Sequence, residues 1–323
     1  MDTLKKIGDN QSVLLSELSK ANIIRQSDEY VATIIAPPIS EADAIIGRFA
    51  CARKPREAIA DQLGEDMNPN FIDISAFGAL EYQVQDHELH AKVGNNKIKR
   101  LVEAGYTEQD ALEIFTAELT ETLRAGMETE VLSAVAASGN YASGMTAAAT
   151  SNRWSTVSND PRAQIGPAMD ALEAMGAPTG SVYIVASPSV WSALRKNTAL
   201  LGTRVDGLRP FASYDDLAFA LGGSNCHAVV ARQQLNGAYV MGDNVALVCR
   251  PETVNSASRC SWRLAFGGSQ DGNPNPIVTQ YYLPGLEHRG PCLGCRLDRQ
   301  LLATGANDAG KQIWSYLITD TLA

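Results

Sequence analysis

The chain has 323 residues, of which 45% are hydrophobic and 20% are charged, and its formal net charge at pH 7 is −9. This composition is typical of a globular protein with one large or two medium domains. Affinity for nucleic acid depends mostly on clustered Lys and Arg, so the negative balance argues against general nucleic-acid binding. A protein that merely encloses nucleic acid is compatible with it.

No targeting or membrane segment is predicted. Residues 1–20 lack a continuous apolar region and a small-residue cleavage site, and no run of about eighteen apolar residues occurs anywhere in the chain. We therefore expect neither export by the usual signal nor a membrane span. The six cysteines are too few for a disulfide scaffold in a chain of this length, so most are expected to be reduced core residues.

The first ninety or so residues read as an arm followed by extended structure. Residues 1–30 are a polar arm with a short amphipathic helix around residues 13–18. Residues 31–40 are predicted as a strand that ends at Pro37-Pro38, because proline donates no hydrogen bond to a ladder. Residues 42–89 are predicted as two strands joined by a long charged tip, with a folded-back surface loop as the alternative. A two-stranded ribbon is marginal in water, so it needs a surface to lie on.

The tip of this hairpin, residues 52–68, carries charges that are segregated by sign. Such a segment fits the surface of a neighbouring subunit better than a core, with its basic start facing acidic groups and its acidic end facing basic ones. A second basic group follows the hairpin. The candidates for contacts between subunits are Arg53, Lys54, Arg56, Glu57, Asp61, Glu65, Asp66, Lys97, Lys99 and Arg100.

The longest helical pattern runs from Thr107 to Ala137, a length of roughly 45 Å. Thr107 and Asp110 are expected to cap its start, and a left-handed residue in the Ser138-Gly139-Asn140 segment is expected to end it. Its other faces carry many acidic residues against Arg124, which predicts either a solvated face or a face that meets basic groups of another subunit. A slowly winding apolar stripe comprises Leu112, Phe115, Leu119, Leu123, Met127, Val131 and Val135.

After Gly139 the pattern becomes an alternation of helices and strands. Ser187 or Ser189 is expected to cap one helix near Pro188. A hairpin is predicted around Gly242-Asp243-Asn244, and the chain beyond Pro251 is strand-like. The predicted helices are 163–176, 187–197 and 213–223, and the predicted strands are 181–187, 226–233, 260–268, 276–284, 295–305 and 311–320.

Motifs that carry chemistry are few, and no catalytic residue or cofactor is expected. The segment from Gly305 to Lys311 has the spacing of a phosphate-binding loop, but Gln312 stands where Ser or Thr is needed, so a hairpin turn is favoured. Cys292 and Cys295 have the spacing of half a zinc or redox site, with His288 as a third metal candidate. Because no second ligand pair follows, structural thiols are favoured over a disulfide or a metal.

The order of these elements resembles the major capsid proteins of tailed phages, of the Hong Kong 97 type. One element of that family, a Trp followed by Asp-Pro and a helix, is matched by Trp154, Asp160 and Pro161. Another, a strand and a helix that end in Leu-x-x-Asn, is matched by residues 182–197. The resemblance covers the chain from about residue 30 to its end.

The resemblance implies an α+β fold with an N-terminal arm, an extended β-hairpin loop, a peripheral domain with a long spine helix, and an α/β axial domain. The implied segments are 1–30 for the arm, 31–105 for the peripheral-domain strand and extended loop, 106–160 for the spine helix and the rest of the peripheral domain, 161–254 for the axial domain, and 255–323 for the returning strands.

The function implied by the resemblance is that of a major capsid protein. Hexamers and pentamers would form an icosahedral shell around the double-stranded DNA of a tailed phage, in a virion assembled in the host cytoplasm. Implied partners are further copies of the chain, a portal, and a separate scaffold or decoration protein. No long N-terminal coiled segment of the kind that acts as a built-in scaffold is present, so a separate scaffold protein, or none, is expected. No residue matches the lysine and asparagine that crosslink in the type member. The alternatives are an encapsulin-like nanocompartment shell and an enzyme that uses Cys292 and Cys295.

Overall fold

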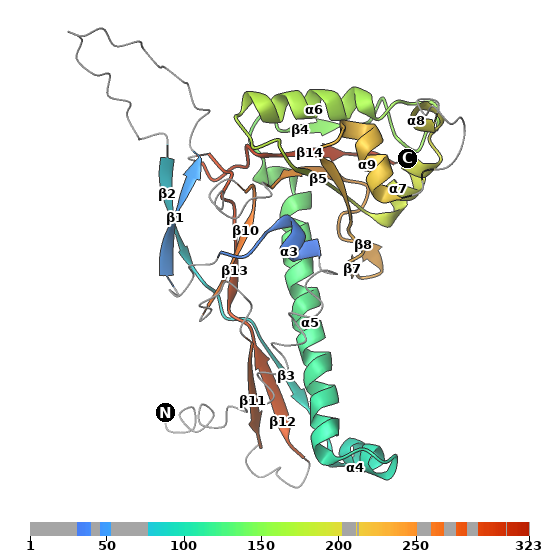
Figure 1. Cartoon of the computed structure of the whole chain (residues 1–323). Helices are drawn as coiled ribbons and strands as arrows, with labels where there is room; N and C mark the ends of the chain where they lie inside the picture. Colours follow the sequence, from blue (N-terminus) through green and yellow to red (C-terminus); the bar gives the residue numbers. More distant parts are fainter. Residues whose placement is uncertain are drawn as a thin grey trace, which may run out of the picture. The chain divides into compact units, whose positions relative to one another are not determined.

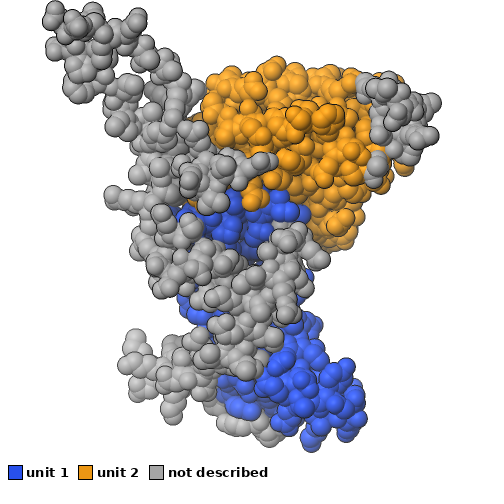
Figure 2. Space-filling view, viewed as in Figure 1, with its two compact units in different colours: residues 1–47, 82–130, 264–301 blue, residues 48–81, 131–263, 302–323 orange. Residues whose placement is uncertain are grey.

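The computed structural model describes residues 31–39, 46–52, 77–201, 211, 213–250, 260–267, 276–282, 290–307 and 309–322, with the backbone alone at 46–52 and 77–81. The chain divides into two compact units (Figure 2). Unit 1 comprises residues 1–47, 82–130 and 264–301, and unit 2 comprises residues 48–81, 131–263 and 302–323. None of the described helices has both the length and the apolar character that a membrane span requires.

Unit 1 contains a three-stranded antiparallel sheet that lies beside helix α5 (Figure 1). The strand order is β11-β12-β3, and Cys295 of β12 lies opposite Val278 on one neighbour and Leu89 on the other. Val278, Leu293 and Cys295 are fully buried and point to the same face, so this face is the core side of the sheet. The elements of this unit are α3 (Val31–Ile35), β3 (Glu88–Lys92), α4 (Asn95–Glu103), most of α5 (Glu108–Ala136), β10 (Arg263–Phe266), β11 (Ile277–Tyr281), β12 (Cys292–Arg296) and β13 (Arg299–Leu302).

Helix α5 confirms the long helix that the sequence predicts, with the predicted cap at its start. The Thr107 hydroxyl accepts from the Asp110 backbone N–H at 3.1 Å, and the Asp110 carboxylate accepts from the Thr107 backbone N–H at 2.8 Å. The Thr107 hydroxyl also donates to the Asp110 carboxylate at 2.7 Å, and the two bonds that the carboxylate accepts from Thr107 hold the pKa of Asp110 below its ordinary value. The stripe is buried from Leu119 onward, whereas Leu112 and Phe115 are only partly covered.

The predicted left-handed end of this helix is wrong. Among the described residues, Gly139 is not one of those with positive φ, and a short 3₁₀ turn, Ser138–Asn140, follows the helix instead. Side chains replace the expected glycine cap at the last carbonyls. Asn140 Nδ2 donates to Ala134 O at 2.8 Å, and the buried Tyr141 hydroxyl donates to Val135 O at 2.6 Å.

The strand predicted at residues 31–40 is also wrong, because Val31–Ile35 form helix α3. The cause lies on α5, where the Glu128 carboxylate accepts from the Val31 backbone N–H at 2.8 Å and also from the Ala32 N–H. A carboxylate at a helix N-terminus satisfies free donors and is favoured by the helix dipole. Burial nevertheless raises the pKa of Glu128, so the cost of desolvating this carboxylate exceeds the gain from its hydrogen bonds.

Unit 2 is built on a five-stranded mixed sheet with the order β4-β14-β9-β5-β6. Helices α6 and α9 contact each other and lie against β14 and β6 respectively (Figure 1). The central strand β9 pairs antiparallel with both β14 and β5, and all its residues are buried. The elements are β4 (Thr146–Ala148), α6 (Arg162–Ala174), β5 (Val182–Ala186), α7 (Pro188–Arg195), α8 (Thr198–Leu201), α9 (Tyr214–Gly222), β6 (Cys226–Val230), β9 (Val245–Cys249) and β14 (Ser315–Thr319).

Two local predictions in unit 2 need correction. Ser187 occupies the N-cap position of α7, but its hydroxyl donates to Gly242 O and makes no capping bond. The predicted hairpin around Gly242 does not form, because β9 pairs inside the large sheet. The hairpin lies one turn earlier, between β7 (Gln234–Leu235) and β8 (Ala238–Tyr239). Asn236 and Gly237 both have positive φ there, as the favoured two-residue hairpin turn requires.

The extended hairpin predicted at residues 42–89 is confirmed in its strands. β1 (Ile46–Ala52) and β2 (Phe77–Gln83) pair as a two-stranded sheet. Its tip, like the predicted helix in residues 1–30, lies outside the described residues.

Candidate functional site

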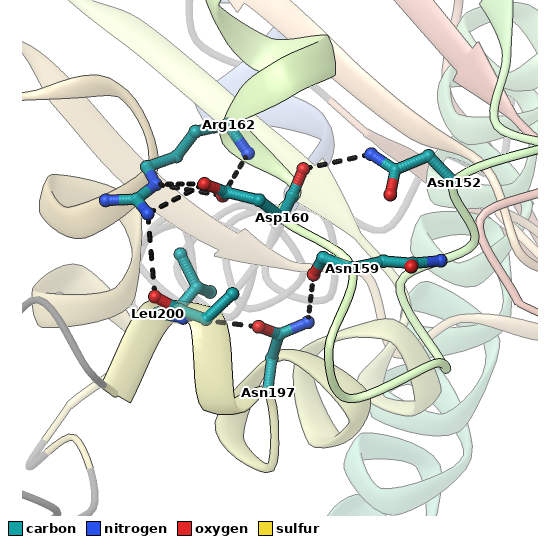
Figure 3. Close-up of polar contacts among 7 residues, drawn as sticks. Asn152, Asn159, Asp160, Arg162, Asn197 and Leu200 are labelled. Carbon is teal, nitrogen blue, oxygen red and sulfur yellow. Dashed lines mark hydrogen bonds and ion pairs between the residues drawn. The ribbon is translucent and has the colours of Figure 1, made fainter.

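The two sequence elements that carry the family resemblance meet at one corner of unit 2 (Figure 3). Trp154 is fully buried, its indole Nε1 donates to Gln164 Oε1 at 2.5 Å, and its backbone N–H donates to Thr321 O at 2.7 Å. These bonds tie the loop before α6 both to that helix and to the chain that follows β14.

Asp160 and Arg162 form a bidentate ion pair at the start of α6 (Figure 3). Arg162 Nε and Nη2 donate to the carboxylate at 2.9 and 2.7 Å, and the Arg162 backbone N–H donates to it at 3.0 Å. These contacts lower the pKa of Asp160 and raise the pKa of Arg162, so both groups are held in their charged forms.

Asn197 joins the second element to the first. Its side chain is fully buried, Nδ2 donates to Asn159 O at 2.8 Å, and Oδ1 accepts from the Leu200 backbone N–H at 3.2 Å (Figure 3). The Thr198 backbone N–H adds a bond to Val157 O at 2.8 Å. The polar groups of this corner form hydrogen bonds with one another, and these bonds hold the loop before α6 against the end of α7. They therefore stabilise the fold of unit 2.

Replacement of this buried amide is expected to destabilise unit 2. Asn197→Ala removes a donor and an acceptor at once, and the bonds to the buried Leu200 N–H and the half-buried Asn159 carbonyl are lost, at a cost of about 1–3 kcal/mol. The free energy of unfolding in urea measures the effect. Asn96→Ala, at an exposed position of α4, is the matched control. Equal unfolding free energies for the two variants would contradict the role assigned to Asn197.

The two cysteines of the predicted half-site lie on opposite faces of β12. Side chains alternate along a strand, so residues three apart point in opposite directions, roughly 10 Å from each other along the strand. Both are buried free cysteines, and Cys295 Sγ lies 4.0 Å from Thr120 Oγ1. This geometry supports structural thiols and gives no support to a disulfide between the two cysteines or to a metal held by both. His288 lies outside the described residues.

The segment with phosphate-loop spacing forms a turn, as predicted. The Lys311 backbone N–H donates to Asn307 Oδ1 at 3.0 Å, and the Asn307 backbone N–H donates to Lys311 O at 2.9 Å. No described helix follows to present its N-terminus to a phosphate, since strand β14 comes next.

An ion pair inside unit 1 has no local signal in the sequence. Arg299 is 3% exposed, and its Nε donates to Glu130 Oε2 at 3.0 Å, while His87 Nε2 lies 3.9 Å from the same oxygen. Burial lowers the pKa of Arg299, although the Glu130 carboxylate acts in the opposite direction. Since Glu130 and Arg299 are far apart in sequence, only the fold brings them together.

The structure places three of the ten candidates for contacts between subunits. Lys97, Lys99 and Arg100 are all exposed on helix α4. Lys97 Nζ lies 5.8 Å from the centroid of the Phe115 ring, so this lysine contacts α5 within the same unit. The seven charged residues of the hairpin tip lie outside the described residues.

No protein-family model matches the sequence, and no curated protein is significantly similar to it. Solved structures do match. A phage-related protein from Bordetella bronchiseptica RB50 has a TM-score of 0.69 at 17% identity, over 97% of each chain. A virus-like particle from Pyrococcus furiosus has a TM-score of 0.53 at 9% identity, over 94% of this chain and 98% of that one. The capsid of Cyanophage P-SCSP1u has a TM-score of 0.50 at 11% identity, over 84% and 82%. The chain therefore has the α+β fold of tailed-phage capsid proteins that its sequence predicts.

Proposed function

We propose that this chain is a major capsid protein. Copies of it assemble as hexamers and pentamers into an icosahedral shell that encloses the double-stranded DNA of a tailed phage. The observation that supports the proposal most is the match over 97% of both chains to a phage-related protein, together with the likeness to a cyanophage capsid. A likeness over the whole chain supports a shared architecture rather than one shared motif.

Each part of the chain has a role in this proposal. Unit 1, with α5 as its spine, is the peripheral domain, and unit 2 is the axial domain near the capsomer centre. The extended hairpin that contains β1 and β2 reaches over a neighbouring subunit. The charged tip residues and the three basic residues of α4 serve contacts between subunits, since sign-segregated charges select one docking orientation.

The role proposed is structural rather than catalytic, in the virion capsid after assembly in the host cytoplasm. A portal, and a separate scaffold or decoration protein, are the further partners. The net charge of −9 suits the inner wall of a DNA container, because packed DNA must slide during entry and exit and a wall with little affinity for phosphate does not hold it.

A second candidate function is the shell of a cellular nanocompartment. The likeness to a virus-like particle from Pyrococcus furiosus, over 98% of that chain, supports assembly into a particle, which a phage capsid and a nanocompartment have in common. Particles isolated from a lysing host separate the two candidates. Double-stranded DNA that is protected from nuclease supports the phage capsid, and particles without DNA support the nanocompartment.

Expression of the chain alone tests self-assembly directly. Negative-stain microscopy and sedimentation are expected to show rings or closed shells, because the extended hairpin and the partly uncovered long helix need surfaces that a monomer does not provide. A protein that stays a stable monomer at every salt and protein concentration would contradict the proposal.

A further inference from the structure

The corner of unit 1 formed by α4 and the first turns of α5 carries exposed basic groups. Lys99 and Arg100 are exposed, and neither forms an ion pair with a described residue. Lys97 already lies over the Phe115 ring of α5. A residue two positions further along a helix is turned by about 200°, so Lys99 points away from the α5 of its own chain.

Helix α5 presents acidic groups on an exposed face. Glu118, Glu121 and Thr122 are spaced three and four apart, so they share one side of the helix, and all three are exposed. Glu121 lies 3.9 Å from Arg124 Nη1, and Glu118 forms no ion pair with a described residue. Like charges three residues apart on a helix repel each other, and a cation from a second copy would weaken this repulsion further than Arg124 does.

Apolar groups accompany these charges at the same corner. Seven large hydrophobic side chains are prominently exposed among the described residues, and three of them lie between residues 102 and 114. Val102 on α4 is 43% exposed, Tyr106 in the connecting turn is 49% exposed, and Ile114 on α5 is 44% exposed. Val102 is three residues from Lys99 and shares its side of the helix. Apolar groups next to complementary charges are the usual composition of a protein contact surface.

We propose that these two surfaces dock onto each other between two copies of the chain. Lys99 and Arg100 of one copy face Glu118 and Glu121 of the other, and the apolar side chains of the α4–α5 corner lie beside the charges. The inference rests on the proposed function and deepens it, since it names the partner of α4 as a second α5 rather than the acidic end of the hairpin tip. The surface is small, so each contact is weak, and repetition in a shell supplies the avidity.

Charge reversal tests the contact, with wild-type assembly measured in parallel. Lys99→Glu with Arg100→Glu makes α4 acidic, and Glu118→Lys with Thr122→Lys makes the α5 face basic. Each pair is expected to raise the protein concentration needed for assembly about tenfold or more, because repulsion replaces attraction. The four substitutions together restore opposite charges and are expected to restore assembly. All four positions are exposed, so circular dichroism and thermal unfolding of the subunits should not change.

A control with the same change in net charge is Lys196→Glu with Arg232→Glu, at exposed positions of unit 2. Equal loss of assembly in this control and in the α4 variant would indicate an effect of net charge and would overturn the inference. Failure of the fourfold variant to recover would overturn it too, because α4 would then face another partner, such as the hairpin tip.

The α4–α5 contact and the proposed function fail in different ways. If wild-type protein assembles and each reversed pair assembles equally well, only this contact is wrong. If wild-type protein stays monomeric, both are wrong. Wild-type assembly should also weaken as salt rises above about 0.1 M, where exposed charges are screened beyond roughly 10 Å.

Discussion

Gly290→Ala is expected to leave the subunit insoluble. Gly290 has φ +103°, a conformation that costs a side-chain-bearing residue about 1–3 kcal/mol. An added Cβ would also lie 2.7 Å from the Asn95 backbone nitrogen and still closer to the carbonyl oxygen of Val93. Both neighbours are backbone atoms, at the point where the Val93 N–H donates to Pro291 O at 2.9 Å and α4 begins. Relief of the clash would therefore displace the link between the chain before β12 and the start of α4.

Gly105→Ala is the matched control for this prediction. Gly105 lies in the same unit with φ +96°, but an added Cβ there meets nothing within 4 Å. The control carries the backbone strain without the clash, and it should stay soluble with a reduced free energy of unfolding. The soluble fraction after expression and urea unfolding of the soluble protein compare the two variants. Equal soluble fractions and unfolding free energies for the two variants would show that the close backbone contact at Gly290 does not hinder a side chain.

Leu123→Asp is expected to prevent folding of unit 1. Leu123 is 5% exposed on the apolar stripe of α5, and a carboxylate at this position would be buried without a designed partner. Truncation to Ala at such a site costs about 2–5 kcal/mol, and a buried charge costs more. Solubility and circular dichroism measure the outcome.

The neighbouring position provides the control for the buried charge. Thr122 is exposed on the same turn of α5, so Thr122→Asp introduces the same group into the same helix on its solvent side. This variant should be soluble and fold cooperatively. A soluble, cooperatively folding Leu123→Asp protein would mean that the apolar stripe of α5 does not form part of the core.

The sequence predicts well those features that are encoded within a few residues. The cap of α5 at Thr107 and Asp110 is local, and the structure confirms it. The helices and strands of unit 2 follow from local periodicity in the same way. The Asn236-Gly237 turn also has a local signal, because Asn-Gly favours a two-residue hairpin, although the predicted turn lies at Gly242.

The features that sequence reasoning missed depend on residues far apart in the chain. Helix α3 has a β-branched sequence that favours a strand, but the Glu128 carboxylate, 97 residues away, binds its first N–H groups. The pair of Glu130 with Arg299 joins residues that are 169 positions apart. For the proposed contact between α4 of one copy and α5 of another, the sequence indicates the basic residues of α4 from their charge alone. Their exposure, and their position beside exposed apolar groups, required the fold.

The hydrogen bond from Val31 to Glu128 also ties the rotation of helix α5 about its own axis to the position of the start of α3. A helix turns by about 100° per residue, so a shift of α5 by a single residue would turn Glu128 away from the start of α3. The carboxylate would then be buried without the N–H groups that it binds now, which opposes such a rotation. The angular setting of this part of α5 and the placement of residue 31 are therefore locked together. Torque on the helix would be transmitted directly to Val31 at the start of α3.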